Sequence, residues 1–198
     1  SIKITINLSL SNILHSIYLE ISHFFCKKLH FFHMFVILRG EKGKGMEIMY
    51  PELKENRPHG TMDYPYSQYY MRKPQKAFLI PVHWHDEVEI IYLKKGQLRI
   101  SIEEENFDAV PGDIFFVNSG ELHFMESNDM AVEYYTLLFP LEFISFQSKD
   151  ILEREVLQPL RGRKLLFIKT LRGNLCLEKV EQFLKEMISV NDKKEEGY

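Results

Sequence analysis

The stretch His83-Trp84-His85-Asp86-Glu87-Val88-Glu89, followed by Gly96, is the part of the sequence that decides the fold. Side chains alternate between the two faces of an extended strand, so His83, His85 and Glu89 share one face and Trp84 takes the other. Glu87 has the same parity, and we therefore expect a bend or bulge near Asp86 that decides which acid turns inward. The stretch predicts a strand that brings two imidazoles and one carboxylate together.

A third histidine, His123, lies beyond the next turns, on a strand that could run beside the first. Imidazole and carboxylate donors in this combination suit zinc, nickel, iron or manganese, with room left for water or a ligand. The alternative is that these side chains form hydrogen bonds within the folded domain or contact a small-molecule effector, without any metal. In both cases we expect one shared effector or metal site formed by His83, His85, Glu89 and His123.

Short runs of β-branched and aromatic residues, separated by turn signals, extend over residues 77–139. Such a pattern is typical of an all-β sandwich or barrel, and a jelly roll limits the number of exposed strand edges. Gly96 reads as the turn of a hairpin, and Leu98, Ile100 and Phe116 are expected in the core. We expect strands over Val88–Leu93, Gln97–Ile102, Phe107–Val110, Ile114–Val117, Leu122–Met125 and Ala131–Phe139.

The spacing His83-x-His85-x3-Glu89-x6-Gly96 resembles the first motif of the cupin superfamily, and Pro111-Gly-Asp113 with Gly120-x-x-His123 resembles the second. The resemblance covers residues 75–139 and is nearest to the sensor domains of AraC-family regulators. It implies a mainly β fold, a cupin double-stranded β-barrel with C-terminal α-helices, which binds a small-molecule effector such as a sugar or a small organic acid.

The sequence departs from the cupin motifs at three turn positions. Ala77 stands where the first motif opens with glycine, Asn118 stands where the second usually has proline, and the trailing asparagine falls one position late, at Asn128. These departures touch turns rather than the four candidate ligands.

Beyond Pro140 the pattern becomes helical, with short candidates at Leu141–Phe146 and Asp150–Leu157. A longer amphipathic helix capped by Asn174 is predicted by apolar residues at three- and four-residue intervals, namely Leu177, Val180, Phe183, Leu184, Met187 and Ile188. We expect this helix to dock on the barrel or to pair two subunits as a homodimer. The region resembles the linker of AraC-family regulators, which implies a chain truncated before the helix-turn-helix DNA-binding domain.

The first 45 residues differ in composition from the rest, with six Lys or Arg against two Glu. The stretch Arg39–Gly45 can be encoded wholly by purine codons and directly precedes Met46. We therefore expect residues 1–45 to be a non-native upstream extension, the alternative being a genuine N-terminal helix pair. Residues 46–140 are then the cupin effector-binding barrel and residues 141–198 the helical linker or dimerisation region.

Charge and cysteine content narrow the possible partners and compartment. From residue 46 onward there are 19 basic and 26 acidic side chains, so this stretch is not expected to bind DNA directly. Cys26 and Cys176 match no disulfide framework, which favours free thiols in the cytoplasm. Charged residues interrupt every window of about 18 residues that could span a membrane, so no membrane contact is expected.

The sequence thus favours the effector-sensing domain of an AraC-type bacterial transcription regulator rather than an enzyme. The alternative is a stand-alone metal-binding cupin or a metal-dependent enzyme that acts on a small sugar or carbonyl compound through the same four residues.

Overall fold

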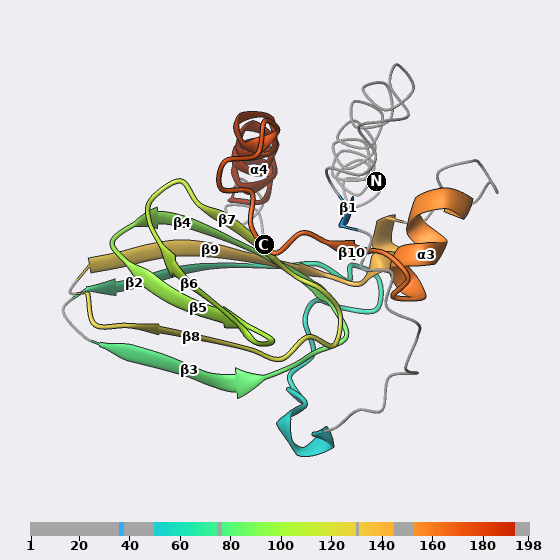
Figure 1. Cartoon of the computed structure of the whole chain (residues 1–198), viewed down its shortest axis with the longest axis horizontal. Coiled ribbons are helices and arrows are strands. Elements are labelled where there is room, and N and C mark those ends of the chain that lie inside the picture. Colours follow the sequence, from blue (N-terminus) through green and yellow to red (C-terminus); the bar gives the residue numbers. More distant parts are fainter. Residues whose placement is uncertain (1–35, 38–49, 75–76, 130, 145–152, 193–198) are drawn as a thin grey trace.

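The computed structural model describes residues 36–37, 50–74, 77–129, 131–144 and 153–192, and its body is a pair of facing four-stranded antiparallel sheets (Figure 1). One sheet has the strand order β2-β9-β4-β7 and the other β3-β8-β5-β6. The predicted mainly β jelly roll is confirmed. The strands are β2 Ser67–Pro74, β3 Phe78–His83, β4 Val88–Lys95, β5 Leu98–Ile102, β6 Glu105–Ala109, β7 Ile114–Val117, β8 His123–Ser127 and β9 Ala131–Phe139.

Strands β4 and β5 follow one another in sequence but belong to different sheets. The chain crosses at Gly96, where φ is 80°, and an added Cβ would lie 2.7 Å from the carbonyl oxygen of Ala131. Glycine is the residue that adopts this conformation without a steric penalty. The prediction that Gly96 closes a hairpin was wrong, because a turn signal marks where a strand ends but not which strand it pairs with.

Apolar side chains from both sheets fill the space between them. Leu98 and Ile100 of β5 are at most 1% exposed, whereas Arg99 between them is exposed to solvent. Their predicted burial is confirmed. This interior core consists of Ile91, Leu93, Leu98, Ile100, Ile102, Ala109, Phe115, Val117, Met125, Val132 and Tyr134.

Strand β4 is buried on both faces. Ile91 and Leu93 belong to the interior core, while Ile90 and Tyr92 belong to a second core on the outer face of the sheet. The second core is covered by the C-terminal region, whose buried apolar residues are Leu141, Leu157, Leu160, Leu165, Leu171, Leu184, Met187 and Ile188. The sheet β2-β9-β4-β7 therefore lies between two hydrophobic layers.

The main element of the outer layer is helix α4, Leu177–Asp192, which docks on the sheet through Leu184, Met187 and Ile188 (Figure 1). The Tyr92 hydroxyl donates to Glu181 Oε1 at 2.6 Å and fixes one side of the helix. Docking, one of the two predicted roles of this helix, is thus observed. No helix in the described part of the chain is long and apolar enough to cross a membrane.

The 3-10 helix η2 Leu141–Ile144, the π-helix η3 Glu153–Leu157 and helix α3 Gln158–Arg161 contribute to the same layer. Strand β1 Val36–Ile37 pairs with β10 Leu166–Phe167, and the 3-10 helix η1 Pro51–Leu53 lies elsewhere, next to Trp84. After β10 the chain runs along the free edge of β7. The backbone N–H of Phe116 donates to Lys169, and that of Leu171 donates to Ile114, each at 3.1 Å. Residues 169–171 therefore extend the sheet by one more extended segment.

One prediction about the strands was wrong, and one strand was missed. Phe116 does not enter the interior core, because the odd-numbered residues of β7 face inward. Its ring is partly buried in the outer layer and stacks on Phe167 at 5.3 Å. Strand β2 was not predicted, because its sequence is largely polar and it lies at the edge of its sheet, where no apolar alternation is required.

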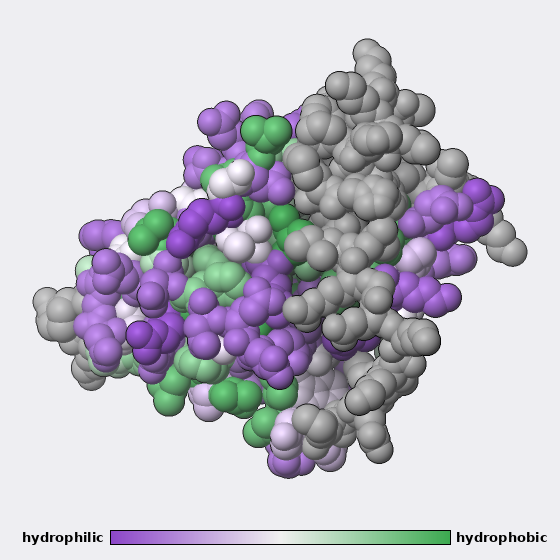
Figure 2. Space-filling view, viewed as in Figure 1, coloured by the Kyte–Doolittle hydropathy of each residue, from purple (hydrophilic) through white to green (hydrophobic). Residues whose placement is uncertain are grey.

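The surface in Figure 2 is largely hydrophilic over the strands, with small hydrophobic groups near the edge where β3 lies in Figure 1. Leu79 and Val82 of β3 are the exposed apolar side chains of that edge strand, at 62% and 43%. Isolated apolar residues at a surface are ordinary for a folded protein.

Replacing Leu98 or Ile100 by Ala is expected to lower the free energy of unfolding by about 2–5 kcal/mol, because each change leaves a cavity in the interior core. Phe116→Ala should cost less, about 1–2 kcal/mol, since its ring is only partly buried. Urea unfolding measures all three. Arg99→Ala is the matched control and should change stability by less than about 0.5 kcal/mol; equal effects at Leu98 and Arg99 would contradict the burial.

Candidate functional site

The four predicted site residues meet at one end of the barrel, but not on a single strand. His83 ends β3, His85 lies in the crossing between β3 and β4, Glu89 belongs to β4, and His123 begins β8. The expectation of one continuous strand was wrong, whereas the expected bend is present at Asp86 and Glu87. The site joins the two sheets, since His83 pairs with His123 in one and Glu89 lies in the other.

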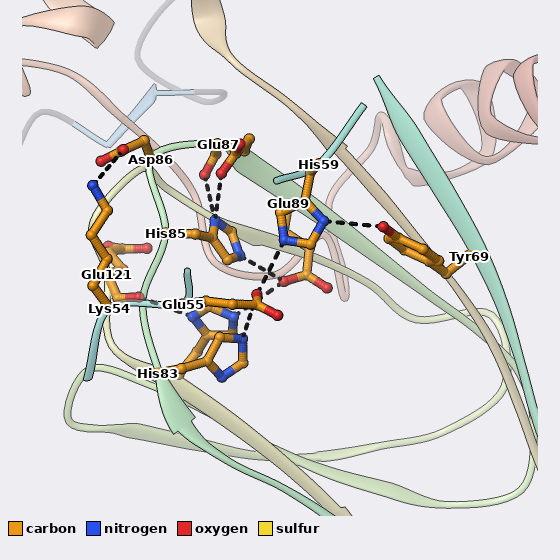
Figure 3. A network of polar contacts seen from close by, with 11 residues as sticks. Lys54, Glu55, His59, Tyr69, His83, His85, Asp86, Glu87, Glu89 and Glu121 are labelled. Carbon is orange, nitrogen blue, oxygen red and sulfur yellow. Dashed lines mark hydrogen bonds and ion pairs between the residues drawn. The ribbon is translucent and has the colours of Figure 1, made fainter. Parts of the chain in front are cut away.

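The side chains converge closely. One ring nitrogen from each of His83, His85 and His123 lies within 4.8 Å of the others. Glu89 Oε2 lies 3.3 Å from Nε2 of His85 and 3.1 Å from Nε2 of His123 (Figure 3). His83 is the most exposed of the four, at 18% of its side chain, so solvent reaches the cluster from its side.

The backbone fixes the orientation of all three imidazoles. Nδ1 of His83 lies 2.8 Å from the carbonyl oxygen of Pro81, Nδ1 of His85 lies 3.1 Å from that of Glu87, and Nδ1 of His123 lies 2.9 Å from that of Glu121. A carbonyl oxygen only accepts hydrogen bonds, so each Nδ1 carries a proton. In the neutral rings the lone pair is then on Nε2, where it is free to bind a ligand or metal.

Charges in the cluster are strongly coupled. Burial would raise the pKa of Glu89, but the close polar contacts and the charges of His123 and His85 outweigh it and hold this pKa well below its usual range. Burial would lower the pKa of His85, yet the bond to Glu89 and the charges of Glu89 and Glu87 raise it overall. Burial and the nearby His123 lower the pKa of His83. The cluster thus favours one carboxylate and one imidazolium in the absence of metal.

One buried atom shows what else the cluster can accommodate. Nε2 of His123 lies 3.1 Å from Glu89 Oε2 but has no hydrogen bond within the described part of the protein. A buried nitrogen without a hydrogen bond is costly, and a divalent cation would satisfy it. His83, His85, Glu89 and His123 fit such an ion, which would supply a Lewis acid for oxygen atoms of a ligand.

Three site residues were missed by the sequence reasoning: Glu55, His59 and Tyr69. Nε2 of His59 lies 3.1 Å from Glu55 Oε2, and its Nδ1 lies 3.2 Å from the Tyr69 hydroxyl (Figure 3). Glu55 Oε2 also lies 3.8 Å from Nε2 of His83. For His59 the sequence held a signal, since it is the only histidine between Met46 and His83. For Tyr69 it held none, because this residue belongs to strand β2, which was not predicted.

Backbone pairing explains how Glu55 reaches the cluster. The N–H of Glu55 donates to the carbonyl of Trp84 at 2.8 Å, and the N–H of Trp84 donates to Leu53 at 3.1 Å. The buried indole of Trp84 donates from Nε1 to the carbonyl of Tyr50 at 2.9 Å. Trp84, which lies between His83 and His85, therefore anchors residues 53–55 and places the carboxylate of Glu55 near the cluster.

The hydroxyl of Tyr134 is another buried polar atom without a partner among the residues described. Its ring is fully buried in the interior core, where burial and the charge of Glu89 raise its pKa. A hydroxyl left in this state costs free energy unless water or a ligand bonds to it.

Family comparison agrees with this fold. The family model of the AraC-like ligand binding domain matches residues 65–173, which is more than half of the chain. The chain therefore belongs to the AraC-like ligand binding domain family. The expected resemblance is confirmed.

One relative is the uncharacterized HTH-type transcriptional regulator YdeC of Bacillus subtilis (strain 168), which is 37% identical over 78 residues. The match covers 39% of this chain and 27% of YdeC, so the chain corresponds to about a quarter of that regulator.

Among solved structures, oxalate decarboxylase of Bacillus subtilis at pH 4.6 is 25% identical with a TM-score of 0.34, covering 38% of this chain and 21% of that one. The plu4264 protein of Photorhabdus luminescens is 22% identical with a TM-score of 0.35, covering 40% and 67%.

Glu89→Gln in metal-free protein is expected to lower the free energy of unfolding by about 2 kcal/mol at pH 6, where Glu89 and protonated His85 are paired. The folded pKa of His85 is raised, so this contribution is complete below its unfolded pKa and is lost as the pH rises through the folded pKa. Below about pH 4.5 the contribution of Glu89 is lost in turn, as the pH falls toward its lowered folded pKa.

Urea unfolding with a chelator present at several pH values measures this difference. Glu126→Gln, at a partly exposed position of β8, is the matched control and should show a small effect at every pH. A destabilisation by Glu89→Gln that stays constant from pH 6 to pH 9 would contradict the pairing.

Tyr134→Phe is expected to leave stability unchanged or to raise it by up to about 1 kcal/mol, because it removes a buried hydroxyl without a protein partner. Thermal unfolding is the measurement. A loss above about 1 kcal/mol would mean that the protein itself satisfies this hydroxyl.

Proposed function

We propose that the chain is the effector-sensing part of an AraC-type transcription regulator, with a small-molecule effector bound at His83, His85, Glu89 and His123. The observation that carries the proposal is the convergence of three imidazoles, each with Nδ1 held by the backbone, two of which contact the buried carboxylate of Glu89. A site oriented in advance loses little entropy on binding. Membership of a ligand-binding family supports the same conclusion.

The charges of the site distinguish two classes of effector. Glu89 is buried and ionised, and Glu55 and Glu87 lie near His83 and His85. An organic acid would be repelled by these carboxylates unless a divalent metal is bound at the same four residues. A sugar needs no metal, because its hydroxyl groups can donate hydrogen bonds to the carboxylate of Glu89.

Other partners follow from the same proposal. DNA binding would be carried by helix-turn-helix units of the regulator and not by the acidic barrel, as the name of the relative YdeC also suggests. Such a regulator would act in the cytoplasm. Pairing of two copies through the exposed face of α4 stays a prediction, and light scattering would test it.

A metal-dependent enzyme acting on a small sugar or carbonyl compound is the second candidate. The contact between Glu55 and His59 favours it, because this pair places a possible proton acceptor beside the histidine cluster. Bound stoichiometric metal together with turnover of such a compound would make the enzyme the better description.

The test is a thermal-shift screen of sugars and organic acids, with and without a chelator, beside elemental analysis of the purified protein. An effector at a hundred times its Kd should stabilise the fold by about 2.7 kcal/mol. Sugars should act in the presence of chelator, whereas organic acids should require metal.

The double variant His83→Ala with His85→Ala should abolish the shift while the protein still unfolds cooperatively, because the interior core is made by other residues. Arg99→Ala serves as the control and should keep the full shift. An effector that stabilises the double variant as strongly as the native chain would refute the site.

A further inference from the structure

We infer that Asn118 and Glu121 are positioning residues that couple the histidine cluster to the linker segment 163–171. The inference rests on the proposed function, because it assigns a route by which occupancy of that site reaches the linker. Both residues lie in the loop Asn118–Glu121 between β7 and β8, in a turn where the related cupin motif usually has proline at position 118.

On one side the loop holds two of the site histidines. The backbone carbonyl of Glu121 accepts the Nδ1 proton of His123 at 2.9 Å, and the N–H of Gly120 donates to the carbonyl of His85 at 2.8 Å. The loop thus orients the ring of His123 and holds the backbone of His85. A ligand that shifts the His123 ring must move this loop or lose a hydrogen bond.

Within the loop, the carboxylate of Glu121 ties the two ends together. Its Oε2 accepts from the backbone N–H of Asn118 at 2.8 Å and from the side-chain Nδ2 of Asn118 at 3.1 Å. Both side chains are buried, Glu121 at 2% and Asn118 at 5% exposure. A buried network with satisfied partners moves as a unit rather than residue by residue.

On the other side Asn118 binds the linker at two points. Its Oδ1 accepts from the N–H of Phe167 at 2.7 Å, and its Nδ2 donates to the carbonyl of Phe167 at 3.1 Å. The amide orientation is unambiguous, because a backbone N–H only donates and a carbonyl only accepts. Arg163 adds a bond from Nη1 to the carbonyl of Ser119 at 2.6 Å.

These bonds continue the register of the linker along β7. Phe115 is bridged to Thr170, and Asn118 is opposite Phe167 in the same antiparallel register, with its side chain in place of a backbone partner. Proline at position 118 would supply neither the donor nor the acceptor. The departure from the cupin motif thus creates the link between the site and the segment that leads to α4.

Amide hydrogen exchange on the 198-residue chain without ligand tests the link. Asn118→Ala should speed exchange at Phe167 and Leu171 by about five-fold or more, the effect of losing one hydrogen bond or more. It should also shift the imidazole ¹⁵N signals of His85 and His123, which a role limited to holding the linker would not do. Ser127→Ala removes a buried hydroxyl bond to Gln97 at the far end of β8 and should change neither readout.

A double-mutant comparison tests whether His123 and Asn118 affect the linker amides through the same contacts. His123→Ala alone should speed exchange of the same linker amides, and adding Asn118→Ala should give no more than the effect of Asn118→Ala alone. If Asn118→Ala does not fold, Arg163→Ala takes its place, since it removes the bond to Ser119 from the linker side.

Unchanged imidazole signals, or effects of the two substitutions that simply multiply, would overturn the inference. Because no ligand is used, that result leaves effector binding at the cluster standing. Conversely, an effector screen without any hit would remove the proposed function while coupled exchange would still show the link.

Discussion

The buried carboxylate of Glu89 is the constraint on which the rest of the site depends. A charge inside a protein requires partners, and here they are two imidazoles that approach from the opposite sheet and from the crossing segment. Their rings can turn toward Glu89 only because backbone carbonyls hold the other ring nitrogens. Electrostatic interactions therefore determine the structure of the barrel end that holds Glu89, and apolar packing between the sheets determines the structure of the remainder.

Strand β4 belongs both to the charged candidate site and to the apolar packing. One face carries Glu89 and the interior core, and the other face carries the apolar layer beneath α4. Together with the pairing of residues 169–171 to the edge of β7, this arrangement connects the C-terminal region to the candidate site through continuous packing and hydrogen bonds.

The sequence allowed much of the fold to be predicted, because turn residues and period-two apolar alternation mark strand ends locally. Pairing is different: nothing near Gly96 indicates that β4 and β5 enter separate sheets, and nothing near Phe116 indicates which layer it faces. The four candidate site residues lie close together, as the motif spacing predicted, although the assumed continuous strand was wrong. Glu55, His59 and Tyr69 could not be found, because their proximity depends on the pairing of residues 53–55 with Trp84 and on strand β2.

The unequal burial of the two sheets has a consequence for engineering. The sheet β3-β8-β5-β6 has an outer face that carries solvent-exposed charged residues such as Arg99 and Asp108, whereas β4 has hydrophobic layers on both sides. A designer who wishes to change ligand preference should therefore randomise inward positions of β5 and β8. Backbone adjustments there can relax toward water, whereas the same adjustment on β4 would be transmitted to the helix that covers it.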